Sequence, residues 1–189
     1  MRKPEILVFA GPNGSGKSTI TEGVEIVGEY VNADEIKKQL GCTDIEAAQI
    51  ATARREELLL KRENFTFETV LSARRNLELL QRARESGYFI KCFYVLTENP
   101  KINIQRVAIR VGDGGHDVPT DKIVSRYHKC MTLIPELVDV CDVIHIYDNT
   151  EFPFRIFKKK KEETYIWTSD VWERQQIEEL VSSKYISHH

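Results

Sequence analysis

The residues best suited to chemistry lie near the start of the sequence, in the run Gly11-Pro-Asn-Gly-Ser-Gly-Lys-Ser18. This run fits G-x-x-x-x-G-K-[ST], the pattern of a loop that binds phosphate groups. The glycines let backbone amide hydrogens converge on one anion, and Lys17 brings a full charge to the terminal phosphates. The Ser18 hydroxyl suits the Mg²⁺ that bridges those phosphates. The residues expected to hold a nucleoside triphosphate are Gly11, Asn13, Gly14, Ser15, Gly16, Lys17, Ser18 and Thr19.

The segments on either side of this loop support the same interpretation. Residues 5–10, EILVFA, are apolar like a buried parallel strand, and residues 17–27 suit a helix. A helix that starts at the loop adds the partial positive charge of its N-terminus to the anion site. The structural alternative is a glycine-rich turn that contains Gly-Lys by chance, and the order strand, loop, helix disfavours it.

The phosphate loop alone does not say which reaction follows. A GTPase would need D-x-x-G and N-K-x-D motifs in suitable places, and the sequence has neither. An ABC-type motor would need an LSGGQ-like signature and a strand that ends in Asp-Glu, whereas YVLTEN offers only Glu98. A small-molecule kinase needs an acidic residue near the γ-phosphate and arginines over it, and this chain has both.

Acidic candidates follow two of the expected strands. Asp34 comes just after the strand at 29–33, beside Asn32, where open α/β sheets gather their ligands. A carboxylate there can accept the proton of an attacking hydroxyl, and capping the next helix is the alternative role. Glu68 and Thr69 lie near the end of the strand NFTFETVLS and are candidates for binding the acceptor. A solvent-facing position on an edge strand is the alternative for Glu68.

Three arginines flank a glycine-rich break, VGDGGHDVP at 111–119. Arg106 and Arg110 are four residues apart and therefore share one helix face. Arg126 follows the break. A flexible segment between helices that carry arginines is typical of a lid, whose guanidinium groups stabilise charge on the transferred phosphoryl group. Solvated surface arginines are the alternative, and the phosphate loop favours the lid.

Strand-like and helix-like segments alternate, which predicts an α/β fold with a mostly parallel central sheet and helices on both faces. Together with the phosphate loop and the expected lid, this pattern predicts a three-layer sandwich of the P-loop NTPase, nucleotide kinase-like type, with a small lid. The expected strands are 5–10, 29–33, 64–72, 88–96 and 142–149, and the expected helices are 17–27, 44–63, 74–85, 99–111, 121–137 and 171–184. We expect one kinase domain over 1–189, with a lid loop at about 111–119 and a C-terminal hairpin and helix at 154–185.

The composition limits the partners. A net charge of −2 gives no overall attraction to nucleic acid or membranes, and no apolar run approaches the roughly 20 residues that would span a bilayer. The lysines at 158–161 are followed at once by Glu162 and Glu163, which indicates a solvated turn rather than a nucleic-acid site. The four cysteines form no C-x-x-C pair, which points to reduced thiols and the cytoplasm.

In chain order, the stretches GPNGSGKST, NADEI, FETVLS, RVAIRVGDGGHDVP, SRYHK and YDNT resemble the zeta toxin family of P-loop kinases, over roughly residues 6–150. The glycine-rich stretch with the arginine-tyrosine pair after it is the more specific part. The resemblance implies ATP-dependent phosphorylation of a sugar nucleotide, typically UDP-N-acetylglucosamine, at a sugar hydroxyl. It implies that Asp34 is the catalytic base, that Glu68 and Thr69 bind the acceptor, and that Arg110 and Arg126 contact the transferring phosphate.

The sequence also departs from the family. Lys37 and Lys38 stand where the family often has an arginine, and the chain leaves less room for insertions that enclose a nucleotide-sugar. We expect a cytoplasmic kinase that uses ATP and Mg²⁺, with Lys17 in the catalytic set and Asn32 and Arg106 as further candidates for the substrate site. Two alternatives stay open: a kinase for another nucleoside, antibiotic or metabolite, and an ATP-binding regulatory module that transfers nothing. An antitoxin protein is a further candidate partner.

Overall fold

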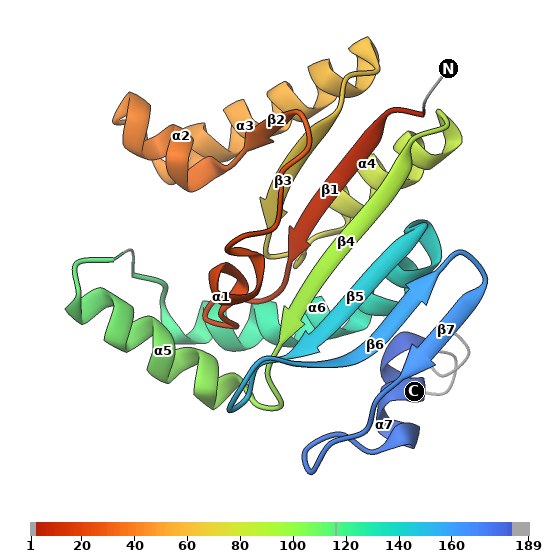
Figure 1. The fold of residues 1–189 in the computed structure, drawn as a ribbon. Helices are drawn as coiled ribbons and strands as arrows, with labels where there is room; N and C mark the ends of the chain where they lie inside the picture. The colour runs from red at the N-terminus through yellow and green to blue at the C-terminus, as the bar shows by residue number, and fades with distance from the viewer. Residues whose placement is uncertain (1–2, 116, 183–189) are drawn as a thin grey trace.

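The structure is a computed structural model that describes residues 3–115 and 117–182. Its centre is a seven-stranded sheet with the order β2-β3-β1-β4-β5-β6-β7 (Figure 1). The parallel strands are β1 (Glu5–Ala10), β2 (Glu29–Val31), β3 (Phe65–Thr69), β4 (Phe89–Leu96) and β5 (Val143–Asp148). The antiparallel hairpin of β6 (Phe154–Lys160) and β7 (Glu163–Ile166) extends one edge. The predicted α/β fold with a mostly parallel sheet is confirmed.

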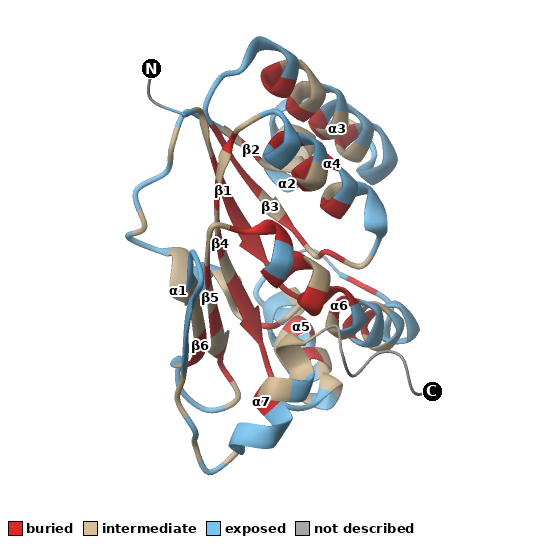
Figure 2. Ribbon diagram, turned by 90° about the vertical axis from the view of Figure 1, so that its right-hand side faces the viewer, coloured by how far each residue is buried: buried red, intermediate tan, exposed pale blue. Residues whose placement is uncertain are grey.

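The helices are distributed unevenly over the two faces of the sheet (Figure 2). One face is covered by α3 (Asp44–Lys61), α4 (Arg74–Glu85), α6 (Thr120–Val140) and α7 (Arg174–Val181). Of the helices in the described residues, α1 (Lys17–Thr21) alone lies on the other face, near the carboxyl ends of the strands. Next to α3 lies α2 (Ala33–Leu40), and α5 (Pro100–Gly112) packs beside α6. The second helical layer of the expected sandwich is therefore small.

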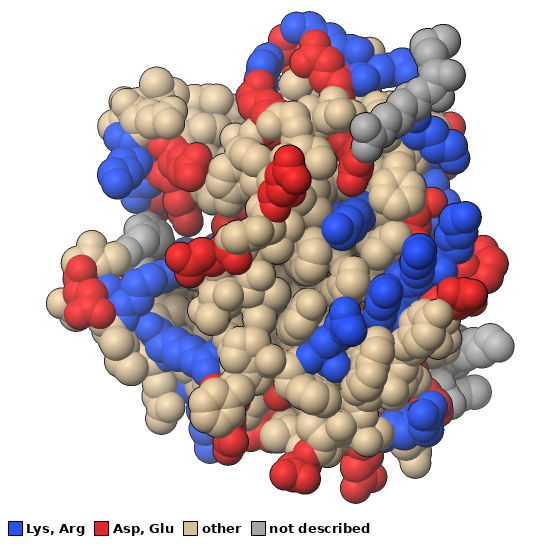
Figure 3. Space-filling model, in the orientation of Figure 1, with Lys and Arg blue, Asp and Glu red and all other residues tan. Residues whose placement is uncertain are grey.

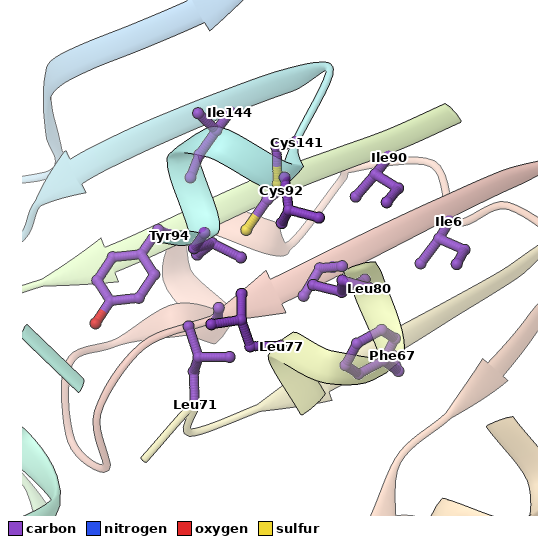
Figure 4. Close-up of a cluster of buried hydrophobic side chains, with 14 of the residues drawn as sticks. Ile6, Phe67, Leu71, Leu77, Leu80, Ile90, Cys92, Tyr94, Cys141 and Ile144 are labelled. Carbon is purple, nitrogen blue, oxygen red and sulfur yellow. The ribbon is translucent and has the colours of Figure 1, made fainter. Parts of the chain in front are cut away.

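The main core lies between the sheet and its helix-covered face, and Figure 4 shows part of it. Side chains of β4 and β5 alternate between this core and the other face. Ile90, Cys92 and Tyr94 of β4 are fully buried, whereas Lys91 and Phe93 between them are half-buried. The same alternation on β5 indicates that the face opposite the core meets solvent there. Central β1, in contrast, is buried along almost its whole length.

Several boundaries differ from the sequence-based expectations. The helix predicted over 17–27 ends at Thr21, since Glu22 has a non-helical ψ of 122° and Gly23 then takes a left-handed φ of +83°. Helix α6 runs through Pro135 and continues to Val140. The final helix begins at Arg174 rather than at 171, and its expected end at 184 lies outside the described residues.

The expected lid segment is described only in part. Residues 111–112 belong to the end of α5, 113–115 form a turn, and 117–119 lead into α6, while position 116 lies outside the described residues. Lid closure therefore stays a prediction. In the described part of the chain, no helix has the length and apolar character that crossing a membrane requires.

Candidate active site

The loop between β1 and α1 has the backbone shape that its glycines predict. Gly14 and Gly16 adopt left-handed φ angles of +74° and +81°. A Cβ at Gly14 would lie 2.5 Å from the carbonyl oxygen of Asn103, and one at Gly16 would lie 2.2 Å from Nδ2 of Asn149. Both positions therefore need glycine for conformation and for space. The first amides of a helix have no partner within it, which makes those of Lys17 and Ser18 available to an anion, whereas the Thr19 amide donates to the Gly16 carbonyl at 3.1 Å.

Side chains from distant segments hold this loop. Asn103 of α5 is fully buried and donates through Nδ2 to the Asn13 carbonyl at 2.7 Å. Asn149, after β5, donates through Nδ2 to the Ser15 carbonyl at 2.9 Å. Arg126 of α6 donates to Oδ1 of Asn13 at 3.1 Å. The loop is thereby fixed from three elements, which pre-organises it for a phosphate.

Lys17 is held at the centre of this loop. Its Nζ donates to the carbonyl of Gly11 at 2.9 Å and to that of Pro12 at 3.3 Å, and it lies 3.6 Å from Oε1 of Glu68. Burial lowers the pKa of the Lys17 ammonium, and the charge of Glu68 partly offsets this. A buried ammonium with one carboxylate neighbour gains more from a second anion than an exposed lysine would.

Glu68 is part of a polar network rather than a solvent-facing residue of an edge strand. Strand β3 lies between β2 and β1, which rules out the edge position. Oε2 of Glu68 accepts from the Tyr30 hydroxyl at 3.2 Å and from Nδ2 of Asn32 at 3.3 Å. Asn32 also donates to the Tyr30 hydroxyl at 3.0 Å. Burial raises the pKa of Tyr30 to about 12, so the phenol stays a neutral donor.

Asn32 also performs the capping role that Asp34 was considered for. Its Oδ1 accepts from the amides of Asp34 at 2.8 Å and Glu35 at 3.4 Å, which starts α2. The Asp34 side chain is left exposed in the first turn. It lines a cavity of about 580 Å³ together with Lys37, Lys38, Gly41, Cys42, Arg110, Gly114 and Gly115.

A second cavity of about 290 Å³ adjoins the phosphate loop. It is lined by Gly14, Gly16, Lys17, Ser18, Glu68, Arg106, Val107 and Arg110. Arg110 lines both cavities, so the cavity at the loop and the cavity at Asp34 adjoin at this side chain, between α2 and α5. Figure 3 shows this region as a hollow at the left of the molecule. As predicted, Arg106 and Arg110 share one face of α5, and Arg106 also donates to the Thr150 carbonyl at 3.0 Å.

Some predicted site residues lie outside these two cavities. The Thr69 hydroxyl is buried and accepts from the Leu71 amide at 2.9 Å and from Asn76 at 2.7 Å, so it stabilises the turn after β3. Ser15, within the loop, is fully buried. Arg126 contacts the loop through Asn13 but does not line either cavity. Thr19 is exposed on α1, and Gly11 joins the loop to β3 through its amide.

The donor groups present fit a metal ion that is held mainly by phosphate oxygens. The described residues contain no group of three or more His, Cys, Asp or Glu side chains that could hold a metal by themselves. Ser18 lines the cavity next to Lys17, where a hydroxyl oxygen suits Mg²⁺. In nucleotide sites Mg²⁺ keeps several water ligands and takes further oxygens from the phosphates.

The comparison with known families decides what kind of protein this is. The family model described as zeta toxin matches residues 1–171 of the chain. The chain belongs to the zeta toxin family. With a nucleotide kinase-like fold and a complete phosphate loop, this zeta toxin family member is a phosphotransferase.

The individual proteins and structures that this chain resembles have low sequence identity to it. An uncharacterized protein of Haemophilus influenzae strain Rd is 28% identical over 130 residues, which are 64% of this chain and 91% of that protein. A structure from the PezAT toxin-antitoxin system of Streptococcus pneumoniae has a TM-score of 0.58 at 20% identity, over 96% of this chain and 79% of that one. The AvrRxo1-ORF1:ORF2 complex with ATP has a TM-score of 0.71 at 15% identity, over 99% and 66%. These two structures share the fold.

Proposed function

We propose that this protein transfers the γ-phosphoryl group of ATP to a hydroxyl of a small acceptor, and that the acceptor is a UDP-amino sugar. One observation carries the proposal: the loop with Lys17 and the helix start with Asp34 line two adjoining cavities, and Arg110 belongs to both. Phosphoryl transfer needs this arrangement, since the donor phosphate, a base and a cation must meet in one place.

Each residue has a role in this proposal. The loop amides and Lys17 hold the β- and γ-phosphates, and Asp34 accepts the proton of the acceptor hydroxyl as its oxygen bonds to the γ-phosphorus. The bond from that phosphorus to the bridging oxygen breaks, and ADP leaves. Arg110 stabilises the charge on the transferred group. Mg²⁺, which Ser18 would help to hold, neutralises charge on the donor phosphates when it is bound.

The charges of the larger cavity support an anionic acceptor. Lys37, Lys38 and Arg110 line that cavity together with Asp34, although the chain as a whole has a net charge of −2. Lys37 also forms an ion pair with Asp44 at 2.7 Å. An acceptor that carries its own phosphates and also offers a hydroxyl would bind the cationic side chains through the phosphates and Asp34 through the hydroxyl. A sugar nucleotide combines these features. We propose that Glu68, which lines the smaller cavity, accepts a hydrogen bond from another hydroxyl of the acceptor.

The proposal also includes a cellular location and a protein partner. ATP and sugar nucleotides are cytoplasmic metabolites, so we place the protein in the cytoplasm as a single kinase domain. We also propose an antitoxin protein as a partner, because the compared structures include a toxin-antitoxin system. A soluble antitoxin would be found by testing whether the product of a neighbouring gene suppresses phosphoryl transfer.

The test is a transfer assay with labelled ATP and a set of acceptors: UDP-amino sugars, nucleosides and aminoglycosides. We expect a phosphorylated UDP-amino sugar, identified by mass spectrometry. Asp34→Asn should lower kcat by about 10²–10⁴-fold, while the affinity for a non-hydrolysable ATP analogue stays unchanged. Glu35→Gln, one residue further along the same exposed helix start, is the matched control and should remain active.

The outcomes separate the alternatives. Transfer only to another class of acceptor would replace the proposed substrate but keep the kinase. Tight ATP binding without any phosphorylated product would favour the regulatory module. Full turnover by Asp34→Asn would refute the base assignment.

A further inference from the structure

Half of the sheet has no helix over one of its faces. On the side of α1, the strands β4 to β7 are covered neither by α1, which sits at their carboxyl ends, nor by another helix of the described chain (Figures 1 and 2). We call this surface the outer face of β4–β7. Ile144 and Ile146 of β5 point away from it and are fully buried, while His145 and Tyr147 lie on it and are half-buried.

Aromatic rings cover this outer face. The Phe93 ring stacks on His145 with centroids 5.0 Å apart and an interplanar angle of 9°. Phe93 and Tyr147 are also stacked, with centroids 6.5 Å apart. At the hairpin, Tyr165 and Trp167 stack at 6.1 Å. Contiguous aromatic side chains on a solvent-facing sheet are typical of a binding surface, whereas single exposed apolar side chains are normal on any protein surface.

Cations lie over these rings. Arg155 is 4.5 Å from the centroid of Trp167, Lys158 is 5.6 Å from Tyr165, and Lys91 is 5.0 Å from Phe93. Within residues 3–115 and 117–182, no carboxylate forms an ion pair with any of the three. Figure 3 looks onto this face and shows the basic side chains as a band across it. Glu163, on the same face of β7, accepts from the Tyr165 hydroxyl at 2.9 Å. The three cations outnumber this carboxylate, so the outer face has an excess of positive charge on an acidic protein.

The same charges act on His145. Arg155 Nη1 lies 3.4 Å from its Nδ1. Burial, and then the charges of Arg155, Lys158 and Lys91, lower the pKa of His145 to about 4. The imidazole is therefore neutral at pH 7, which leaves the ring apolar enough to stack while the three cations supply the charge.

The ring contacts favour one kind of anionic partner. Stacking on nucleobases needs free ring faces. Here the faces of Phe93, Tyr165 and Trp167 are already in contact with neighbouring rings and with cations. Cationic groups and the partially positive edges of aromatic rings attract anionic side chains. These groups suit carboxylates rather than bases.

We propose that the outer face of β4–β7 binds a protein partner that presents Asp or Glu side chains among apolar residues. The partner would sit beside the hairpin β6–β7, on the opposite side of β1 from β2, α2 and the Asp34 cavity. A partner bound there would therefore leave the Asp34 cavity accessible to substrates. This proposal does not depend on the acceptor or on the reaction.

The test uses a labelled short peptide of alternating Glu and Leu as a probe, with the Gln-Leu peptide, an oligothymidylate and the protein alone as comparisons. We expect saturable binding of the Glu-Leu peptide by fluorescence anisotropy. Arg155→Glu/Lys158→Glu should weaken it by about tenfold or more, since both charges are reversed. The matched control Lys122→Glu/Lys129→Glu, on exposed positions of α6, should bind as the wild type does. Phosphoryl transfer should be unchanged in both variants.

Nuclear magnetic resonance on the wild-type protein avoids dependence on the folding of a variant. The peptide should shift the amide signals of His145, Tyr147 and Trp167. Shifts confined to other regions, equal binding of the Gln-Leu peptide, or undiminished binding by the charge-reversed variant would each overturn the proposal. Tighter binding of oligothymidylate at the same residues would replace the partner with a nucleic acid. Dimerisation of the protein alone that Arg155→Glu/Lys158→Glu abolishes would replace it with a second copy.

Discussion

Replacement of Gly16 by alanine should disturb the phosphate loop in two separable ways. First, the left-handed φ of +81° costs a non-glycine residue about 1 kcal/mol. Second, the new Cβ would lie 2.2 Å from Nδ2 of Asn149, so this buried amide must swing away from the Ser15 carbonyl. Loss of that hydrogen bond adds about 1–3 kcal/mol. We expect Gly16→Ala to lower the free energy of unfolding by about 2–4 kcal/mol.

A double-mutant cycle measured by urea unfolding tests this reasoning. Asn149→Ala alone loses the same hydrogen bond. In Gly16→Ala/Asn149→Ala nothing is left to clash, and only the backbone cost of about 1 kcal/mol is added. The double variant should therefore be more stable than the sum of the single changes predicts, by about 1–3 kcal/mol. Gly41→Ala, at a left-handed helix end with open space around it, is the control for the backbone cost alone. Strict additivity would refute the proposed contact between position 16 and Asn149.

Three further predictions concern the same cleft. Arg110→Ala should lower kcat/KM by about 10³-fold in steady-state assays, and Arg110→Lys should recover part of it; a loss below about fivefold would contradict its role at the transferred phosphate. Glu68→Gln removes the negative charge that raises the pKa of Lys17. Because binding of an ATP analogue needs the protonated ammonium, the affinity of this variant should fall at a lower pH than that of the wild type as the pH is raised. Identical profiles of affinity between pH 7 and 10 would argue against this coupling. Ser18→Ala should raise the Mg²⁺ concentration required for half-maximal rate by about tenfold, and an unchanged magnesium titration would remove Ser18 from the metal site.

Local patterns predicted much of this architecture. The run EILVFAGPNGSGKS placed a strand, a loop and a helix start, and the structure has β1, the left-handed glycines and α1 there. The Asn99-Pro100 pair predicted the start of α5, where Asn99 accepts from the Lys101 amide. Both signals are local, since the glycines and the cap residue determine the backbone within one turn.

Contacts between segments that are far apart in the chain could not be predicted from the sequence. Asn103 and Asn149 hold loop carbonyls that are 90 and 134 residues away in the chain, and no local pattern marks an asparagine for such a task. The Thr69 hydroxyl was predicted to bind the acceptor, but the turn that follows β3 occupies it. The polar network of Tyr30 with Glu68 depends on the pairing of β2 with β3, which single-sequence reasoning does not provide.

The solvent-facing side of β4 and β5 differs from the predicted sandwich, although the sequence carries a pattern for it. In YFIKCFYVL and DVIHIYDN, half-buried residues such as Lys91 and His145 alternate with fully buried ones. This period of two is typical of a strand with one solvated face, whereas the predicted three-layer sandwich has helices on both faces of the sheet. The helix expected at 17–27, which would have covered more of that face, ends early at Thr21.

The most direct test of the kinase account is a crystal structure with a non-hydrolysable ATP analogue, Mg²⁺ and a UDP-amino sugar. We predict that the terminal phosphate lies against Lys17 and the loop amides. An acceptor hydroxyl should lie about 2.6–3.2 Å from the Asp34 carboxylate, with Arg110 between the two ligands. A nucleotide bound with its terminal phosphate away from this cleft, or an acceptor with no hydroxyl near Asp34, would contradict the account.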